Sequence, residues 1–327
     1  MTPSLFSIIL FTLLLLHVQP SYASIIPPYA PEEPETLDLP IPFYEPVLVP
    51  LNITDEAPPT TTAKAVIVLD ANSATMLLEQ NAATPFPPAS TTKIMTALVA
   101  LDRCKTDDIV TVSALDLNDE NAQMGLVLGE HITVENLLYG LLLNSGNDAA
   151  LNLAEHCGPG KETFIVAMNE KAKKLGLTAT SFQNTTGLDA TGHVMSVRDL
   201  AHLTAAALKN PLIEKIVGTI ETTVRNREET RVHALKNRNQ LLGRISGVIG
   251  GKTGLTEQAG ECLVVAIERD GHRLIVVVFG SSDRFGDAES LIEWGFKNHR
   301  WEKENPTPSA TTTLPELPEG TLENPHR

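Results

Sequence analysis

The segment 89–96 holds a serine and a lysine three residues apart, in the order Ala-Ser-Thr-Thr-Lys-Ile-Met-Thr. Two prolines precede it and apolar residues at helical spacing follow it, so we expect a helix that begins near Ala89. Residues three apart on a helix have Cβ atoms about 5–6 Å apart. A neutral Lys93 amine could therefore take the proton of the Ser90 hydroxyl and make it a nucleophile. Alone, the pattern is equally typical of capping at a helix start.

Two further motifs offer groups that could complete such a site. Residues 144–148 read Asn-Ser-Gly-Asn-Asp, which suits a tight turn between two helices. Residues 250–254 read Gly-Gly-Lys-Thr-Gly, where glycines let a ligand approach the backbone, and Lys252 and Thr253 could hold a carboxylate. A helix stop or a hairpin turn explains each motif alone. Their joint presence, in the order Ser-x-x-Lys, Ser-x-Asn and Lys-Thr-Gly, favours a catalytic site.

The motifs lie among strand and helix patterns that must position them. Strand-like apolar runs are found at 65–69, 75–78, 220–224, 231–235, 261–267 and 274–279. Helical patterns are found at about 89–101, 133–143, 148–156, 163–175, 196–209 and 288–294. Thr133 and Ser196 suit N-caps, and Gly176 suits a helix stop. This order predicts one sheet interrupted by an all-helical lobe, with the site in a cleft between the two lobes.

Both ends of the chain differ in composition from the region between them. Leu5 to Leu16 is an apolar run too short to cross a bilayer comfortably, and the residues before Ser24 suit cleavage after Ala23. No Lys or Arg precedes that run, so an uncleaved membrane anchor stays open. The predicted organisation is a signal peptide at 1–23, a Pro-rich disordered spacer at 24–62, a catalytic domain at 63–301 and a disordered tail at 302–327. The predicted lobes of that domain are a sheet lobe at about 63–85 and 216–301 and a helical lobe at about 86–215.

The charge balance and the cysteines limit the kinds of partner. Of the 327 residues, 25 are Lys or Arg and 40 are Asp or Glu, and the net charge of −15 argues against nucleic acid as a partner. The three cysteines, Cys104, Cys157 and Cys262, form no Cys-x-x-Cys pair and no cluster of metal-ligand spacing, so no metal is predicted. An odd number of cysteines in an exported chain leaves at least one free thiol, which we expect to be buried and inert.

The sequence resembles the low-molecular-mass penicillin-binding proteins, which are serine-type D-alanyl-D-alanine carboxypeptidases of the peptidase S11 kind, over about residues 66–296. Segments that recur in the family are found at 88–96, 143–150, 168–169, 175–177, 184, 187–189, 198–200 and 250–260. The resemblance implies the α+β class and the β-lactamase/DD-peptidase-like fold, an antiparallel sheet flanked by helices plus an all-helical lobe. It also implies hydrolysis with no metal and no cofactor.

The resemblance implies a catalytic role for Ser90, Lys93 and Ser145, with Lys252 among the substrate-binding residues. Ser90 would attack the carbonyl of the penultimate D-alanine and become acylated, with Lys93 as the base that activates it. Ser145, helped by Lys252, would pass a proton to the leaving D-alanine. Water would then release the acyl group from the enzyme.

The resemblance also implies how the substrate is held. Asn147 would hold the catalytic lysine and the substrate amide, and Thr253 would bind the terminal carboxylate. The backbone N–H groups of Ser90 and Leu255 would form the oxyanion hole, which places Gly254 and Leu255 among the substrate-binding residues.

The implied substrate is a peptidoglycan stem peptide that ends in D-Ala-D-Ala, and β-lactam antibiotics would be acylating inhibitors. The protein is predicted to be exported, as a secreted, periplasmic or wall-associated protein, with a membrane partner only if the signal stays uncleaved. A DD-endopeptidase that acts on cross-links is the main alternative. A class A β-lactamase would need a Glu that activates water, and no Glu-x-x-Leu-Asn lies between Ser145 and Lys252. A wall-binding module without activity would not need all three motifs intact.

Three features depart from the family pattern. The hairpin at 72–75 lacks its usual glycine, and Leu255 stands where an aromatic residue or histidine is common. These changes bear on substrate preference more than on chemistry. The second, β-rich domain and the amphipathic C-terminal anchor of many members are not recognised, which leaves the endopeptidase alternative open.

Overall fold

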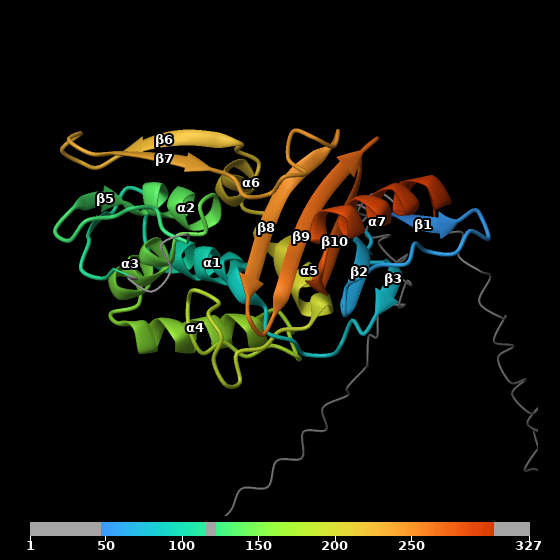
Figure 1. Cartoon of the computed structure of the whole chain (residues 1–327), viewed down its shortest axis with the longest axis horizontal. Helices are drawn as coiled ribbons and strands as arrows, with labels where there is room; N and C mark the ends of the chain where they lie inside the picture. The colour runs from blue at the N-terminus through green and yellow to red at the C-terminus, as the bar shows by residue number, and fades with distance from the viewer. Residues whose placement is uncertain (1–46, 116–121, 304–327) are drawn as a thin grey trace, which may run out of the picture. The chain divides into compact units, whose positions relative to one another are not determined.

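An antiparallel sheet forms the centre of the structure. The computed structural model describes residues 47–115 and 122–303, and within these ranges five strands pair in the order β3-β2-β10-β9-β8 (Figure 1). Three other strand pairs of the same ranges, β1 with β11, β4 with β5 and β6 with β7, lie outside this sheet. The predicted α+β class with an antiparallel sheet is confirmed. The predicted signal peptide and nearly all of the predicted tail lie outside the described residues.

The bounds of the elements are as follows. The strands are β1 Leu48–Asn52, β2 Ala65–Asp70, β3 Met76–Gln80, β4 Ile109–Thr111, β5 His131–Thr133, β6 Glu221–Arg225, β7 Val232–Lys236, β8 Val248–Thr256, β9 Gly260–Arg269, β10 His272–Ser281 and β11 His299–Lys303. The helices are the 3-10 helix η1 Ala89–Thr92 and the α-helices α1 Lys93–Arg103, α2 Val134–Leu142, α3 Asn147–Cys157, α4 Lys161–Lys174, α5 Val197–Ala207, α6 Pro211–Val217 and α7 Arg284–Asn298.

Helices cover both faces of the sheet. Successive side chains of a strand point to opposite faces. On β2, Ile67 and Leu69 pack into a core that includes α1 and α5, whereas Val66 and Val68 pack into a second core with α7. Because both faces are buried, the central strands read as continuous apolar runs, and this is why β2, β9 and β10 could be recognised in the sequence.

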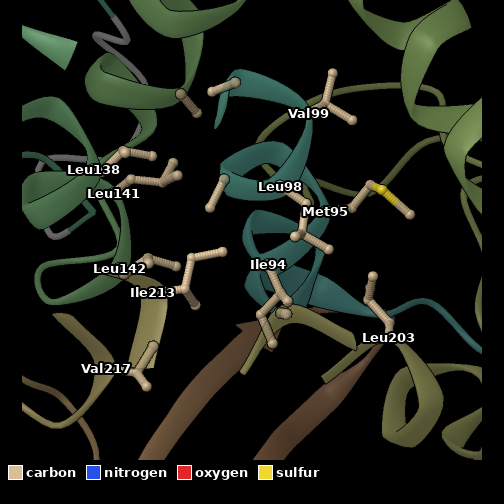
Figure 2. Close-up of a cluster of buried hydrophobic side chains, with 14 of the residues drawn as sticks. Ile94, Met95, Leu98, Val99, Leu138, Leu141, Leu142, Leu203, Ile213 and Val217 are labelled. Atoms are coloured by element: carbon tan, nitrogen blue, oxygen red, sulfur yellow. The ribbon is translucent and has the colours of Figure 1, made fainter. Parts of the chain in front are cut away.

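Helix α1 lies inside a group of helices that holds it on several sides. Figure 2 shows its apolar side chains between those of α2, α5 and α6. The labelled residues are Ile94, Met95, Leu98 and Val99 of α1, Leu138, Leu141 and Leu142 of α2, Leu203 of α5, and Ile213 and Val217 of α6. Burial of each such side chain contributes about 1.5–3 kcal/mol relative to exposure. This packing fixes α1 and, with it, Lys93 in its first turn.

Helix ends are where the sequence predicted them wherever a cap could be recognised. The Thr133 hydroxyl accepts the Asn136 N–H at the start of α2, and the Ser196 hydroxyl accepts the Asp199 N–H at the start of α5. Gly176 follows the end of α4 with φ of 71°, a conformation that glycine adopts at little cost. Local capping chemistry therefore sets these boundaries.

The structure differs from the predicted division into lobes. Strands β6 and β7, predicted within the sheet lobe, form a separate pair that is hydrogen bonded to the helical part. Lys236 N–H donates to Asn144 Oδ1, and Asn136 Nδ2 donates to the Arg225 carbonyl. Helix α5, predicted within the helical lobe, packs on β2 and β10. An alternating pattern identifies a strand but does not say which sheet the strand joins.

The folded region also begins earlier than predicted. Part of the predicted disordered spacer, Leu48–Asn52, forms β1 and pairs antiparallel with β11. Pro50 is tolerated there because a pair of strands leaves each strand an unpaired edge. Thr62 then donates its N–H and its hydroxyl to the Asp287 carboxylate. The folded region therefore runs from about 47 to 303, and residues 24–46 of the predicted spacer lie outside the described residues.

The turn between β2 and β3 shows how the missing glycine is accommodated. Ala74 has φ of 59°, in the left-handed region that favours glycine. The Asp70 carboxylate accepts hydrogen bonds from both the N–H and the hydroxyl of Ser73, at 2.7 Å each. These bonds hold the turn in a conformation that alanine alone would avoid.

Two of the cysteines are joined and one is free. A disulfide connects Cys104 with Cys157, whose Cα atoms are 5.6 Å apart. Cys262 is a free, buried thiol on β9, and burial raises the pKa of Cys262 to about 12. The expected buried and inert thiol is therefore Cys262. Among the described helices, none combines the length and the hydropathy needed to span a bilayer.

Candidate active site

The lysine that begins α1 is fully buried and hydrogen bonded to three groups. Lys93 Nζ lies 2.9 Å from Ser90 Oγ, 2.7 Å from Asn147 Oδ1 and 2.6 Å from the Thr186 carbonyl oxygen. Its exposed fraction is 0%. The structure therefore brings the serine and lysine of the first motif into contact with the asparagine of the second.

Ser90 is presented by a 3-10 helix and not by the first turn of an α-helix. Helix η1 ends at Thr92, and α1 begins at Lys93. Residues three apart are eclipsed in a 3-10 helix, which places Ser90 directly over the lysine amine. The loop that contributes Thr186 packs tightly against η1, because a Cβ at Gly187 would lie 1.9 Å from the Ala89 carbonyl oxygen. No residue larger than glycine fits at position 187 without movement of η1.

The turn before α3 holds Ser145 at the same site. Ser145 has φ of 62°, a left-handed conformation that is uncommon outside glycine and that often marks functional sites. Asn147 begins α3, and the next residue, Asp148, accepts the backbone N–H groups of residues 124–126. This buried carboxylate fixes the segment that places Ala122 beside Ser145.

The Lys-Thr-Gly motif lies inside a strand and not in a turn. Strand β8 is the edge strand of the sheet and pairs with β9 along its length. It runs so close to η1 that a Cβ at Gly254 would lie 3.1 Å from the Ser90 amide nitrogen. This approach is what the expected oxyanion hole between the Ser90 and Leu255 amides requires. The Leu255 side chain itself is 63% exposed.

A pocket of about 220 Å³ opens over the candidate nucleophile. It is lined by Ser90, Ala122, Ser145, Arg238, Thr253, Gly254, Leu255 and Arg284. All three motifs thus contribute to one pocket, together with two arginines. The guanidinium of Arg284 donates through Nη1 to the Gly254 carbonyl, and its buried Nε has no hydrogen-bond partner among the described residues. The two guanidinium groups make the pocket suited to a small anionic ligand.

Lys252 is buried in β8 and has an altered proton affinity. Its Nζ donates to the Thr253 carbonyl at 2.9 Å. Burial lowers the pKa of Lys252 well below its ordinary value, and the positive charges of Lys93, Arg238 and Arg284 lower it further. Such a lysine gives up its proton readily, and an anion that enters the pocket would raise its pKa again.

A buried histidine supports the site from behind. His193 Nδ1 accepts the Gln183 N–H, so the proton of the neutral ring lies on Nε2, which donates to Thr92 Oγ1 at 2.9 Å. Burial lowers the pKa of His193 to about 4, and the Lys93 charge acts in the same direction, while Asp189 opposes it. The neutral ring therefore connects η1 with the 183–193 segment at neutral pH.

The described residues include one possible set of metal ligands, which lies away from Ser90. One cluster of the described residues has metal-ligand spacing, Cys104, Asp108 and His156, at the far end of α1. The sulfur of Cys104 is committed to the disulfide.

Sequence reasoning found the motif residues but missed several groups that surround them. Arg238 and Arg284 lie in segments without a recognisable motif. His193 acts through its tautomer and its burial, neither of which a sequence displays. The Thr186 carbonyl could have been suspected only from the Gly187 turn, because close packing of backbone on backbone requires a glycine there.

Comparison with known proteins gives the same family. A sequence model of the family described as D-alanyl-D-alanine carboxypeptidase matches residues 52–283. The D-alanyl-D-alanine carboxypeptidase DacF of Bacillus subtilis is 36% identical over 245 residues, which cover 72% of this chain and 63% of that relative. This chain therefore spans less than two thirds of the length of DacF.

Two further relatives differ in the activity that their names give. The D-alanyl-D-alanine endopeptidase of Pseudomonas aeruginosa is 34% identical over 236 residues, which cover 70% of this chain and 76% of the relative. The solved structure of the Streptomyces K15 DD-transpeptidase superposes with a TM-score of 0.70 at 33% identity, and covers 74% of this chain and 100% of that one. Fold, motifs and sequence agree, and the chain belongs to the D-alanyl-D-alanine carboxypeptidase family.

Proposed function

We propose that the protein is a serine-type D-Ala-D-Ala carboxypeptidase that removes the terminal D-alanine from peptidoglycan stem peptides through an acyl-enzyme on Ser90. The observation that carries this proposal is the buried Lys93 amine, 2.9 Å from the Oγ of Ser90, which lines a pocket with Ser145, Thr253 and two arginines. A nucleophile, a base and cationic groups are thereby within reach of one small peptide end.

The valences of the lysine amine explain how Ser90 is activated. Besides its carbon, Nζ has three positions, and the Asn147 and Thr186 oxygens accept from two of them. The third position faces Ser90 Oγ and holds either a proton or, in the neutral amine, a lone pair. The lone pair takes the hydroxyl proton as Oγ attacks the substrate carbonyl. The tetrahedral oxygen is then held by the Ser90 and Leu255 amides.

The leaving D-alanine needs a proton as its C–N bond breaks. Ser145 lines the pocket beside Ser90 and can pass a proton to the amine. Lys252 supplies that proton, because its lowered pKa makes the ammonium a stronger acid than an ordinary lysine. The acyl-enzyme is afterwards hydrolysed by water. β-Lactams are expected to acylate Ser90 in the same way and to be released slowly.

The positive charge of the pocket supports an exopeptidase. A carboxypeptidase substrate ends in a free carboxylate, which a hydroxyl and cations can bind. Thr253, Arg238 and Arg284 all line the pocket. An endopeptidase that cleaves cross-links would not need such a concentration of charge at this place. The named endopeptidase relative nevertheless keeps that activity as the alternative. A class A β-lactamase is less favoured, because no Glu-x-x-Leu-Asn lies between Ser145 and Lys252.

The deciding experiment combines Thr253→Val with two peptides, one ending in D-Ala-D-Ala and one with its C-terminus amidated. Charge-assisted hydrogen bonds contribute about 1.5–3 kcal/mol, so Thr253→Val should lower kcat/KM on the acid by about one to two decades. The amide should be a poor substrate for the unmodified enzyme and should lose much less on mutation. The coupling energy between hydroxyl and carboxylate follows from the four rates. A coupling near zero, with the amide cleaved as fast as the acid, would favour the endopeptidase.

We also propose that the protein works outside the cytoplasm. The apolar run at 5–16 and the small residues before Ser24 support export. The Cys104–Cys157 disulfide agrees with an oxidising compartment, where such bonds persist. Fractionation of cells with an antibody to the protein tests this, and recovery in the cytoplasmic fraction with reduced cysteines would contradict it.

A further inference from the structure

Helices α1 and α3 are connected to each other at both of their ends. Each helix begins with a residue of the site, and the two first residues are hydrogen bonded, Lys93 Nζ to Asn147 Oδ1 at 2.7 Å. Each helix ends at a cysteine of the disulfide: Cys157 is the last residue of α3, and Cys104 follows the last residue of α1. The two helices have the same length of 11 residues. They therefore lie side by side and run in the same direction, away from the site.

This arrangement is electrostatically unfavourable and needs a constraint. Parallel helices place like ends of their dipoles together, here the two positive ends beside Ser90. Those ends favour the oxyanion of the reaction but repel each other. A helix of 11 residues is about 16 Å long, so small rotations at the cysteine end move the other end of the helix.

Helix α4 packs against both α1 and α3, and two direct links join the cysteine ends themselves among the described residues. Between Cys104 and Cys157 the chain makes an excursion with a sequence separation of 53, which includes Ser145. Besides the disulfide, the Arg103 guanidinium donates through Nε to the Cys157 carbonyl at 2.9 Å. The faces of α1 and α3 that carry Lys93 and Asn147 also carry small buried residues at helical spacing, which permit close approach: Ala97, Ala100, Ala150 and Ala154.

We propose that the Cys104–Cys157 disulfide is a positioning element for catalysis, which keeps Asn147 against the Lys93 amine by fixing the opposite ends of α1 and α3. This inference rests on the proposed function, since it concerns the base that activates Ser90. The substrate-binding side of the pocket is on β8 and α7, which the disulfide does not join. Loss of the disulfide should therefore slow the acylation step and change the initial binding of substrate or inhibitor little, since of the predicted substrate-binding residues only Asn147 lies on α1 or α3.

The test uses stopped-flow acylation by a chromogenic cephalosporin, which separates the dissociation constant of the first complex from the acylation rate constant. We compare the full-length chain with Cys104→Ser/Cys157→Ser, at least 10 °C below the melting temperature of each. The acylation rate constant should fall roughly tenfold, since displacements well below 1 Å already cost rate, while the dissociation constant stays within twofold. EDTA is present throughout, because Asp108 and His156 could hold a metal with a freed cysteine.

Two controls separate positioning from stability. Leu291→Ala removes a buried side chain of α7 on the other side of the sheet, so it should lower the melting temperature without slowing acylation. Reduction of the unmodified enzyme should reproduce the slow acylation of the double variant, and reoxidation should restore the original rate. Reductant should not change the acylation rate of the double variant. If the double cysteine variant does not fold, reduction and reoxidation of the unmodified enzyme provide the test in its place.

The outcomes are distinct. An acylation rate constant that is unchanged on removal of the disulfide would overturn the positioning role and leave only stabilisation. An equal loss in Leu291→Ala would overturn it as well. If the oxidised enzyme is not acylated at Ser90 at all, the proposed function fails, and the result is recognised by the absence of a covalent adduct in either redox state.

Discussion

Lys93 and Lys252 are both buried at one site, and both donate to neutral carbonyl oxygens of the chain. Carbonyl oxygens satisfy N–H groups of a buried lysine but do not require a full positive charge, as a carboxylate partner would. Loss of a proton from either amine therefore leaves no unpaired carboxylate among these hydrogen-bond partners. This is a suitable basis for one lysine that accepts a proton and another that supplies one.

The first prediction concerns the nucleophile. Ser90→Ala should abolish covalent labelling by penicillin and leave the melting temperature within a few degrees, because the Ser90 hydroxyl caps no helix and its hydrogen bond with Lys93 Nζ contributes about 1 kcal/mol. Mass spectrometry of the unmodified enzyme after incubation with penicillin should find the adduct on the peptide that carries Ser90. An adduct on another peptide would contradict the assignment.

The second prediction concerns His193 and pH. Its folded pKa of about 4 lies below the unfolded value of 6.5, so only the unfolded state takes up this proton between these pH values. The contribution of the neutral His193 ring to the free energy of unfolding is complete above pH 6.5 and is lost as the pH falls towards 4. The loss amounts to about 3 kcal/mol, at 1.36 kcal/mol per pKa unit.

Urea unfolding at pH 7 and pH 4.5 measures this loss. His193→Asn keeps an acceptor for the Gln183 N–H but does not titrate, so it should lose less stability than the unmodified protein over the same range. Titration of the carboxylates affects both proteins and cancels in the difference. Identical losses in the two proteins would show that His193 is not the responsible group.

The motif residues were predictable because their types and order carry the chemistry, and the structure places Ser90, Lys93, Ser145, Asn147 and Thr253 around one point. The supporting residues were not. Arg238, His193 and Arg284 act through where the fold puts them, and a single arginine or histidine in a sequence has no spacing that distinguishes it.

At the scale of elements, the strand that carries the third motif was the least predictable. Strand β8 begins Val-Ile-Gly-Gly-Lys, and its two adjacent glycines read as a turn because glycine is depleted in strands. The structure shows another reason for glycine: a Cβ at Gly251 would lie 2.0 Å from the Val264 carbonyl of the neighbouring strand. By contrast β2, β9 and β10 were recognisable, since burial on both faces gives an apolar run.

The third prediction tests the contact between β8 and η1. In Gly254→Ala the new methyl would lie 2.9 Å from Ala89 Cβ and 3.1 Å from the Ser90 nitrogen, so one of the two elements must shift. We expect acylation by penicillin to slow by about one to two decades, since a 1 Å misplacement can cost 10²-fold.

Gly295→Ala is the matched control for Gly254→Ala. Its methyl would also lie 2.9 Å from a neighbour, but that neighbour is the flexible end of the Leu274 side chain, on the face of the sheet covered by α7. Acylation by this variant should stay within twofold of the unmodified enzyme. If Gly254→Ala is acylated at the normal rate too, the strand and η1 are not as tightly coupled as the structure indicates.

At the scale of the whole molecule, the fold class followed from the order of strands and helices, whereas the boundary of the folded region did not. The segment 47–62 has four prolines or acidic residues in its second half and no apolar run long enough to mark a core strand. Its place depends on partners far along the chain. Lys297 donates to the Glu56 carboxylate at 2.7 Å, and the Trp294 indole donates to the Glu56 carbonyl. Contacts of such sequence separation leave no local signal.

The last prediction follows from this segment. A chain shortened to residues 63–327 loses β1 and Thr62, and it leaves the buried Asp287 carboxylate without the N–H and hydroxyl that Thr62 donates. A buried acceptor that loses its donors costs about 1–3 kcal/mol, and for a domain of this size each kcal/mol lowers the melting temperature by about 2–4 °C. We therefore expect the chain 63–327 to melt roughly 4–8 °C below the chain 47–327.

Thr62→Val within the chain 47–327 separates the two causes, because it removes the hydroxyl and retains the strand. Since β1 lies beside α7 and away from Ser90, acylation by penicillin at low temperature should be the same in all three proteins. Equal melting temperatures for the chains 47–327 and 63–327 would mean that the domain begins at residue 63 after all.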